Sequence, residues 1–392
     1  MKIERKQLLN DLQDFASQGD GVIIGSPGVG KTYVLKKLRQ RLKAAGAPHL
    51  LLRIDQLGNG TTETLRQELS YEGDLIEKLE SIPVSGKNAI LLFDAFDAAR
   101  DEQTRKRFLN LIGRAIQELV KWNIIVTVRT YDAMKSQELL DLFGSPDDTE
   151  YQSEGILCRH FTIPPFNEDE ILQVFDQIGC PQSIYKDGSQ DFKDILATAF
   201  NLWLLEKILK SSDGIPDFSQ IRSEVQLLGL LWQRRIKNEK SEHFLRQIVD
   251  KMVQERSLSV RIDEIDDVDL DEPVFDKLQS DEILTKVSST GQRIAFSHNI
   301  LFDYAISVLL IDDEPQHLER FVTGDPSRPL FLRPSLTYFF TRLWYYDSTS
   351  FWKAFWHIFP NAQSVDLHLV ARLIPTSVIA MKPMRLNNFN CF

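Results

Sequence analysis

Short apolar runs alternate with amphipathic stretches over the first 165 residues of the chain. The runs are unbroken and rich in Val, Ile and Leu, which is typical of buried strands. They cover residues 22–24, 50–54, 89–93 and 124–128, and a fifth strand is expected over residues 156–163. Between them, apolar positions three or four residues apart predict helices over residues 3–17, from Lys31 onward and over residues 104–121. Buried strands that alternate with helices predict an α/β fold, with a parallel sheet covered by helices on both faces.

The pattern becomes helical after Pro164-Pro165. Asn167, followed three positions later by Glu170, predicts the capped start of a helix, and helical spacing continues to residue 256. The acidic stretch over residues 261–273 is expected to be a solvated loop.

The last third of the chain carries two further patterns. Residues 284–298 predict two strands joined by a turn at residues 289–291, and a strongly apolar helix follows over residues 299–311. Helices, a hairpin and another helix in this order indicate a small winged-helix unit. Aromatic residues crowd residues 338–359 with few basic residues among them, so we expect a core between paired helices rather than a base-stacking surface.

Composition narrows the class of protein. Apolar residues make up 43% of the chain, which excludes a disordered polymer. The 46 Lys and Arg residues against 56 Asp and Glu give a net charge of −10, which argues against general nucleic-acid binding. No apolar run reaches the roughly 18 residues of a membrane span, and the N-terminus lacks a signal-peptide pattern. Cys158, Cys180 and Cys391 are too scattered for a disulfide framework, so we expect a soluble, cytoplasmic protein with reduced thiols.

A glycine-rich segment between the first strand and the next helix matches GxxxxGK[ST] in full. It consists of Gly25, Ser26, Pro27, Gly28, Val29, Gly30, Lys31 and Thr32. The glycines let backbone N–H groups turn inward, and together with the helix N-terminus these groups form an anion site. Lys31 adds a charge for the β- and γ-phosphates, and the Thr32 hydroxyl can ligate Mg²⁺. Tyr33, the next residue of the helix, completes the set expected to contact the nucleotide.

An acidic pair follows the third strand. Asp94 ends the apolar run, which is the Walker B position of a carboxylate that would hold Mg²⁺ through water, next to Thr32. Asp97 lies three residues further on and could orient or deprotonate the attacking water, or it could cap the next helix. Asp101 and Glu102 are expected to be charges of that helix's first turn.

An arginine ends the fourth strand. Arg129 would lie at the carboxyl edge of the sheet, where ligands bind in open α/β folds. Its guanidinium could reach the γ-phosphate and sense its presence. A structural salt bridge, for example to Asp132, is the alternative.

The order of these parts resembles the STAND class of P-loop ATPases, which includes NACHT and NB-ARC proteins, over about residues 1–311. The Walker B of that class reads Asp-small-x-Asp, as Asp94-Ala95-Phe96-Asp97 does here, whereas typical AAA+ ATPases place Glu directly after the first Asp. Thr127-Val128-Arg129-Thr130 resembles the sensor arginine of the class. Ala98 stands where the class often carries Glu, which implies slow hydrolysis.

Looser matches imply further contacts. Residues 163–170 resemble the junction before the helical lid. Asn201-Leu202-Trp203-Leu204-Leu205 resembles the lid's Asn-Pro-Leu-Leu-Leu segment, although Trp203 stands near the usual place of the lid proline. Residues 296–304 resemble the winged-helix stretch in which a histidine reaches the β-phosphate of ADP, and His298 is the matching residue. A helix cap or a core position is the alternative for His298. Glu4-Arg5 resembles the start of the stretch that covers the adenine.

The resemblance implies four domains in a short or truncated bacterial member of the class. They are a P-loop NTPase domain at residues 1–165, a helical lid at 166–256, a winged-helix-like domain at 257–315 and a C-terminal all-α segment at 316–392, which would begin a repeat sensor.

The implied function is a slow ATPase switch, closed with ADP and open with ATP, in signalling or antiphage defence. A protein trigger would bind the C-terminal helices, and the ATP state would form a homo-oligomer. Adenine is favoured because no Asn/Thr-Lys-x-Asp segment follows the fourth strand. Two alternatives stay open: a nucleotide-stabilised scaffold, and a DNA-associated AAA+-like ATPase that uses its winged helix. The hairpin offers DNA only Lys286, Arg293 and His298.

Overall fold

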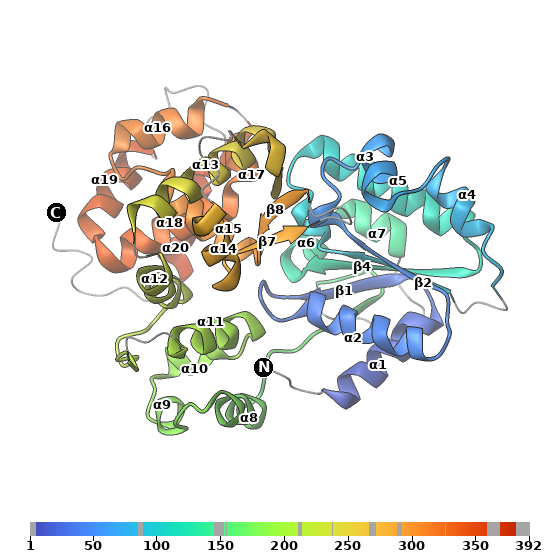
Figure 1. The fold of residues 1–392 in the computed structure, drawn as a ribbon, viewed down its shortest axis with the longest axis horizontal. Coiled ribbons are helices and arrows are strands. Elements are labelled where there is room, and N and C mark those ends of the chain that lie inside the picture. The colour runs from blue at the N-terminus through green and yellow to red at the C-terminus, as the bar shows by residue number, and fades with distance from the viewer. Residues whose placement is uncertain are drawn as a thin grey trace. The chain divides into compact units, whose positions relative to one another are not determined.

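A computed structural model gives the fold of most of the chain (Figure 1). It describes residues 5–84, 89–144, 153, 155–210, 214–236, 238–265, 272–287, 292–325, 327–358 and 369–381. These residues form two compact units, which meet between Glu206 and Lys207 in the sequence. The four-domain division at residues 165, 256 and 315 stays a prediction.

The first unit holds the predicted strand–helix alternation. Its strands are β1 (Gly21–Gly25), β2 (His49–Arg53), β3 (Ala89–Asp94), β4 (Trp122–Arg129) and β5 (His160–Thr162). Its helices are α1 (Lys6–Gln18), α2 (Lys31–Ala44), α3 (Thr62–Leu69), α4 (Leu75–Glu80), α5 (Glu102–Glu118), α6 (Thr130–Lys135), α7 (Gln137–Phe143), α8 (Glu168–Ile178), α9 (Ser183–Lys186), α10 (Gln190–Leu196) and the start of α11 (Ala199–Leu209). Two 3₁₀ turns, η1 (Ile54–Gln56) and η2 (Phe96–Ala98), follow β2 and β3.

The five strands form one parallel sheet in the order β2-β3-β4-β1-β5. Strand β4 therefore lies between β1, which precedes the glycine-rich loop, and β3, which ends at Asp94. The register places Gly25 opposite Arg129 and Arg53 opposite Asp94. The ends of four strands thus bring their polar residues to one edge of the sheet.

Helices cover both faces of this sheet, as predicted (Figure 1). Helices α1 and α2 pack on one face, where Phe15, Leu35 and Ile23 belong to one buried apolar cluster. Helices α3 to α7 pack on the other, where Phe108, Val22 and Ile24 belong to a second buried apolar cluster. Alternate residues of β1 thus enter two separate cores, which explains why its sequence is apolar at every position.

Element ends follow local capping chemistry. The Asn167 side chain and Glu170 form the predicted capping box at the start of α8, with bonds of 2.9 and 3.0 Å. Helix α5 begins earlier than predicted because the Asp101 carboxylate accepts the backbone N–H groups of Gln103 and Thr104. The fifth strand is shorter than predicted and retains only three residues.

The second unit contains the remaining elements. They are α12 (Glu224–Arg235), α13 (Glu239–Glu255), β6 (Ser259–Arg261), η4 (Ile262–Glu264), α14 (Glu272–Ser280), β7 (Leu284–Val287), β8 (Arg293–Phe296), α15 (Asn299–Leu309), α16 (Pro315–Thr323), α17 (Arg328–Phe331), α18 (Arg333–Tyr346), α19 (Ser348–Ile358) and α20 (Leu369–Met381). The turn predicted at residues 289–291 lies outside the described residues, as does Cys391.

The predicted hairpin is part of a three-stranded antiparallel sheet in the order β6-β8-β7. Helices α13, α14 and α15 contact this sheet, which gives the winged-helix-like unit that the sequence predicts. Strand β6 was missed because it is only three residues long and enters the acidic stretch at Arg261. The expectation of a loop over residues 261–273 is therefore wrong at the start of that stretch and also at its end, where α14 begins at Glu272.

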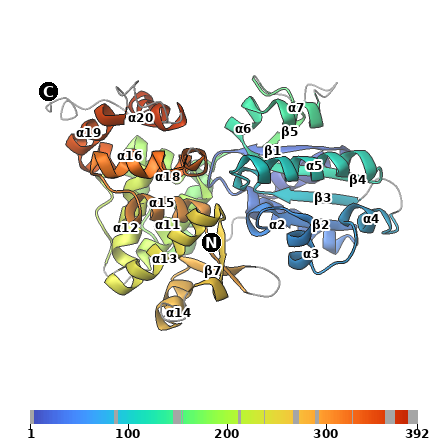
Figure 2. The ribbon, with the colours of Figure 1, turned by 90° about the horizontal axis from the view of Figure 1, so that it is seen from above.

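The aromatic-rich stretch forms a core, as expected. Helices α18, α19 and α20 pack together in the second unit (Figure 2). Phe340 and Trp344 of α18 meet Phe351 of α19 edge to face, with ring centroids 5.9 and 5.0 Å apart. All three side chains are buried. Among the described residues, no helix combines the length and the apolar character that a membrane crossing would require.

We predict that Thr127→Val destabilises the first unit by at least about 2 kcal/mol. The buried Thr127 hydroxyl donates to Asp94 and accepts the Ala95 N–H, so its loss leaves two buried groups without a partner, at about 1–3 kcal/mol each. Urea unfolding followed by circular dichroism measures the change. Ser17→Ala, which removes an exposed hydroxyl of α1, serves as the control. Equal unfolding midpoints for the two variants would contradict this account.

Candidate functional site

The glycine-rich loop joins β1 to α2 at the carboxyl edge of the sheet. Gly28 and Gly30 adopt φ values of 75° and 104°, in the left-handed region that favours glycine. Gly30 is also the N-cap of α2, so the first N–H groups of that helix face the loop. The sequence is therefore folded as a phosphate-binding loop requires, with Lys31 and Thr32 in the first turn of the helix.

The Lys31 ammonium is held against the main chain of its own loop. Its Nζ donates to the carbonyl oxygens of Gly25 and Ser26, at 2.7 and 3.2 Å. Burial lowers the pKa of Lys31, and the charge of Arg129 acts in the same direction, while Asp97 and Asp94 oppose the shift. Phosphate oxygens would favour the charged form further, because they supply an anionic partner in place of the water that burial removes.

Asp94 is buried at the end of β3 and is fixed by the neighbouring strand. Only 1% of the residue is exposed, and its Oδ1 accepts the Thr127 hydroxyl at 2.8 Å. The same hydroxyl accepts the backbone N–H of Ala95 at 2.7 Å. Ala95 has a φ of 59°, which is strained for a residue with a Cβ, so Thr127 stabilises the sharp turn between Asp94 and Asp97.

The second carboxylate oxygen of Asp94 fits a magnesium site. Its Oδ2 is buried and has no hydrogen-bond partner. Such an atom requires a ligand or a water molecule, since a buried carboxylate oxygen without a partner is costly. No group of three or more His, Cys, Asp or Glu in the described part of the chain could hold a metal by itself. Mg²⁺ is usually bound through one or two carboxylates, substrate phosphates and its own waters, and Asp94 is a carboxylate that would hold it here.

Asp97 and Arg129 form an ion pair at the same edge. Arg129 Nε donates to Asp97 Oδ2 at 2.5 Å, and their side chains are 25% and 14% exposed. Burial opposes ionisation of Asp97, but the charges of Arg129 and Lys31 outweigh it and hold the pKa of the carboxyl below its ordinary value. Asp97 does not cap α5, because Asp101 does. The strand-end arginine thus has a structural partner that is itself a predicted catalytic residue.

The start of α11 contacts the phosphate-binding loop within the first unit. The Phe200 N–H donates to the carbonyl oxygen of Gly28 at 2.9 Å. A Cβ on Gly30 would lie only 3.3 Å from the Ala199 methyl. Trp203, which follows in the predicted lid segment, stacks on Phe200 with ring centroids 5.6 Å apart. The lid segment is therefore joined to the loop itself, a contact that the sequence did not reveal.

Arg5 joins the N-terminal segment to the lid junction. Its guanidinium donates to the carbonyl oxygen of Pro164 at 2.8 Å and pairs with Glu170 at 2.8 Å. It also lies 5.0 Å from the centre of the Phe166 ring. Glu4 lies outside the described residues.

Two predicted contacts remain predictions. The Tyr33 side chain is 41% exposed on α2, with Lys37 above its ring at 5.6 Å. His298 precedes α15 in the second unit, and its carbonyl oxygen accepts the Leu301 N–H. No side-chain cap bond from His298 to that helix is seen.

Sequence reasoning missed a polar group at the end of β2. Arg53 and Asp55 form an ion pair at 2.5 Å, next to Asp94 in the sheet register. Lys36 of α2 acts electrostatically on both residues and on Asp94. The available signal was an Arg-Ile-Asp segment directly after an apolar strand, at the edge where ligands bind.

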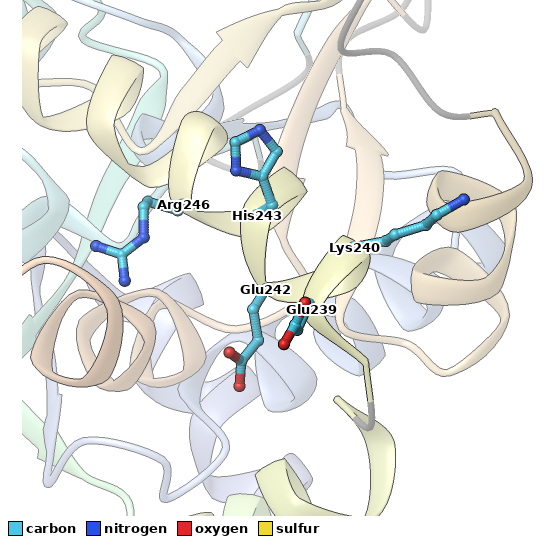
Figure 3. A pocket seen from close by; sticks show the side chains of 5 residues that line it. All are labelled: Glu239, Lys240, Glu242, His243 and Arg246. Carbon is cyan, nitrogen blue, oxygen red and sulfur yellow. The ribbon is translucent and has the colours of Figure 1, made fainter.

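A surface hollow lies beside α13 in the second unit (Figure 3). Five exposed side chains of that one helix line it: Glu239, Lys240, Glu242, His243 and Arg246. Their charges are mixed and the side chains diverge from the helix, so the hollow offers no convergent site for a phosphate or a metal.

Comparison with known proteins supports the assignment of the first unit. Residues 21–179 match the NACHT domain. No curated protein matches the sequence. The matched range begins at β1 and ends after α8, so it contains the loop, Asp94, Asp97 and Arg129.

Solved structures share a distant likeness with the chain. The Walker-type ATPase of Pyrococcus abyssi is 16% identical, with 78% of this chain and 96% of that chain covered and a TM-score of 0.38. The Aeropyrum pernix Orc1 protein in complex with DNA is 12% identical, with coverage of 78% and 93% and a TM-score of 0.38. The replication initiator DnaA bound to AMPPCP and single-stranded DNA is 15% identical, with coverage of 83% and 82% and a TM-score of 0.36.

The family thus rests on the domain match and on the site's own geometry. A left-handed glycine loop, a helix that begins with Lys-Thr and a buried strand-end carboxylate meet at one sheet edge. Residues 21–179 of this chain therefore match the NACHT domain, a P-loop NTPase domain of the STAND class.

Proposed function

We propose that this chain is an ATP-binding, slowly hydrolysing switch that is closed with ADP and open with ATP, and that it serves signalling or antiphage defence. The observation that carries the proposal is the Arg129–Asp97 ion pair. ATP and ADP differ by the γ-phosphate, so a switch needs a group whose partner changes when that phosphate arrives. Arg129 is such a group, because its present partner is the carboxylate expected to handle the attacking water.

The other residues have separate roles in binding. The loop N–H groups and Lys31 bind the β- and γ-phosphates. Thr32 and Asp94 would hold Mg²⁺, which neutralises phosphate charge when it is bound. Contacts to the β-phosphate are available to ADP and ATP alike, whereas contacts to the γ-phosphate are available to ATP only.

Hydrolysis is slow in this arrangement for a physical reason. Asp97 accepts a proton from the attacking water as the water oxygen bonds to the γ-phosphorus and the bond to the β–γ bridging oxygen breaks. A carboxylate whose pKa is lowered by Arg129 is a weak base for this step. When Arg129 turns to the γ-phosphate, the pKa of Asp97 rises, so the base improves only in the ATP state.

The lid provides a way for the site to act on the rest of the chain. The Phe200–Gly28 bond makes the loop conformation depend on the position of α11. A ligand shifts such an equilibrium only through its different affinity for the two states. His298 and the adenine-covering segment at Arg5 would add contacts in the closed state.

A protein trigger is proposed for the C-terminal helices, and a homo-oligomer for the ATP state. Support comes from large apolar side chains that are exposed there, Trp356 at 48%, Leu369 at 64% and Leu373 at 53%. Exposed apolar groups in one region favour protein partners. Nucleic acid is less favoured, because the Arg293 guanidinium is bonded to Ser259 and Lys286 lies over the Phe275 ring.

We predict that Lys31→Ala weakens ATP binding by at least about 100-fold and ADP binding by at least about tenfold. The variant loses charge-assisted bonds to the β- and γ-phosphates of ATP but only to the β-phosphate of ADP, and each bond is worth about 1.5–3 kcal/mol. Isothermal titration calorimetry measures the affinities. Lys43→Ala, at the other end of α2, is the control and should bind like the wild type. Full-strength binding by Lys31→Ala would contradict the assignment of the site.

A second prediction separates sensing from catalysis. Arg129→Gln should lower ATP affinity by about tenfold and leave ADP affinity within about threefold, since only ATP carries the γ-phosphate. Asp97→Asn should keep both affinities and lower turnover by about 100-fold, the range of a lost general base. Binding is measured by calorimetry and turnover by phosphate release. Equal losses for ATP and ADP in Arg129→Gln would remove its sensor role, and wild-type turnover in Asp97→Asn would remove its catalytic role.

A further inference from the structure

The end of β2 carries buried polar atoms that the roles above do not use. Arg53 Nη2 donates to Asp55 Oδ2, but Arg53 Nε and Asp55 Oδ1 are buried without a hydrogen-bond partner. The Asp55 side chain is only 11% exposed. A bidentate arginine–carboxylate pair uses two guanidinium nitrogens and both carboxylate oxygens, because the planar guanidinium matches the geometry of a carboxylate. This pair uses one of each, so its other atoms are available to a third group.

The third group would lie toward Asp94. Arg53 is opposite Asp94 in the sheet, and η1, which contains Asp55, contacts η2, which contains Asp97. Asp94 also has a buried oxygen without a partner. Two carboxylate oxygens and one N–H group on neighbouring strand ends therefore lack partners in the same part of the site.

The two carboxylate oxygens match the hydrogen-bonding character of a metal-bound water. The lone pair of such a water is directed to the metal, so the water can only donate its two protons, and carboxylate oxygens accept them. Mg²⁺ gives up its waters reluctantly and usually keeps several of them. Outer-shell carboxylates that hold such waters are an integral part of metal sites.

We propose that Asp55, held in place by Arg53, is an outer-sphere carboxylate of the magnesium site formed by Thr32 and Asp94, and that it accepts a hydrogen bond from a metal-bound water. This inference rests on the proposed nucleotide site and adds two residues to it. Asp55 is a positioning residue, because it acts through water and touches neither the metal nor the phosphates.

The experiment measures metal binding directly. Purified protein is saturated with ADP and titrated with Mn²⁺ as the probe for Mg²⁺, and free Mn²⁺ is followed by electron paramagnetic resonance. ADP affinity is measured separately in EDTA. Asp55→Asn should weaken Mn²⁺ binding by about 10–100-fold, the usual effect of losing an outer-shell partner, while ADP affinity in EDTA stays within about threefold. Asp55→Glu keeps the charge and should recover part of the metal affinity.

Glu118→Gln is the matched control, because it removes a carboxylate of an arginine pair at the far end of α5. It should leave Mn²⁺ binding unchanged. Wild-type Mn²⁺ affinity in Asp55→Asn would overturn the inference, as would an equal loss of ADP affinity in EDTA, which would mean that Asp55 shapes the phosphate site instead. Failure of the wild-type protein to bind ADP would contradict the proposed function itself. Thermal unfolding of each variant without nucleotide identifies a variant that does not fold, and Asp55→Glu then decides the question.

Discussion

The position of β4 between β1 and β3 is the constraint on which the site depends. Parallel strands end at the same edge, so this order places Gly25, Asp94 and Arg129 within reach of one ligand although they are distant in the sequence. It also places the Thr127 hydroxyl against Asp94 and Ala95. Without that strand order, the loop, the carboxylates and the arginine would be separate motifs.

Bringing these charges together out of water has a cost that they relieve for one another. Burial disfavours the charged forms of Lys31 and Asp97, and their mutual attraction opposes that effect at both residues, while Arg129 favours the charged form of Asp97 only. Two buried carboxylate oxygens, Asp94 Oδ2 and Asp55 Oδ1, still have no hydrogen-bond partner. In the proposed function, phosphates, metal and water would supply partners for these atoms. Binding and the conformation of the site would then be coupled, which is the physical basis of the proposed switch.

The sequence predicted what depends on local pattern. The apolar strands, the glycine loop and the capping box at Asn167 are each encoded within a few residues, and the structure contains all three. Asp94 and Arg129 were identifiable because each directly follows an apolar run. The contacts that complete the site depend on which strands and helices become neighbours, and no single segment encodes them. The Thr127–Asp94 bond, the Arg129–Asp97 pair and the Phe200–Gly28 bond are of this kind. Strand β6 was missed for a different reason, since three residues are too few to show a period.

The central claim is that the strand-end site retains a nucleotide and changes state with its γ-phosphate. The most direct measurement is to purify the protein without added nucleotide, denature it and identify by chromatography what is released. This account predicts near-stoichiometric ADP from the wild type. A protein that releases no nucleotide, and then takes up ATP and hydrolyses it steadily, would contradict a closed ADP state and would indicate a conventional motor or loader.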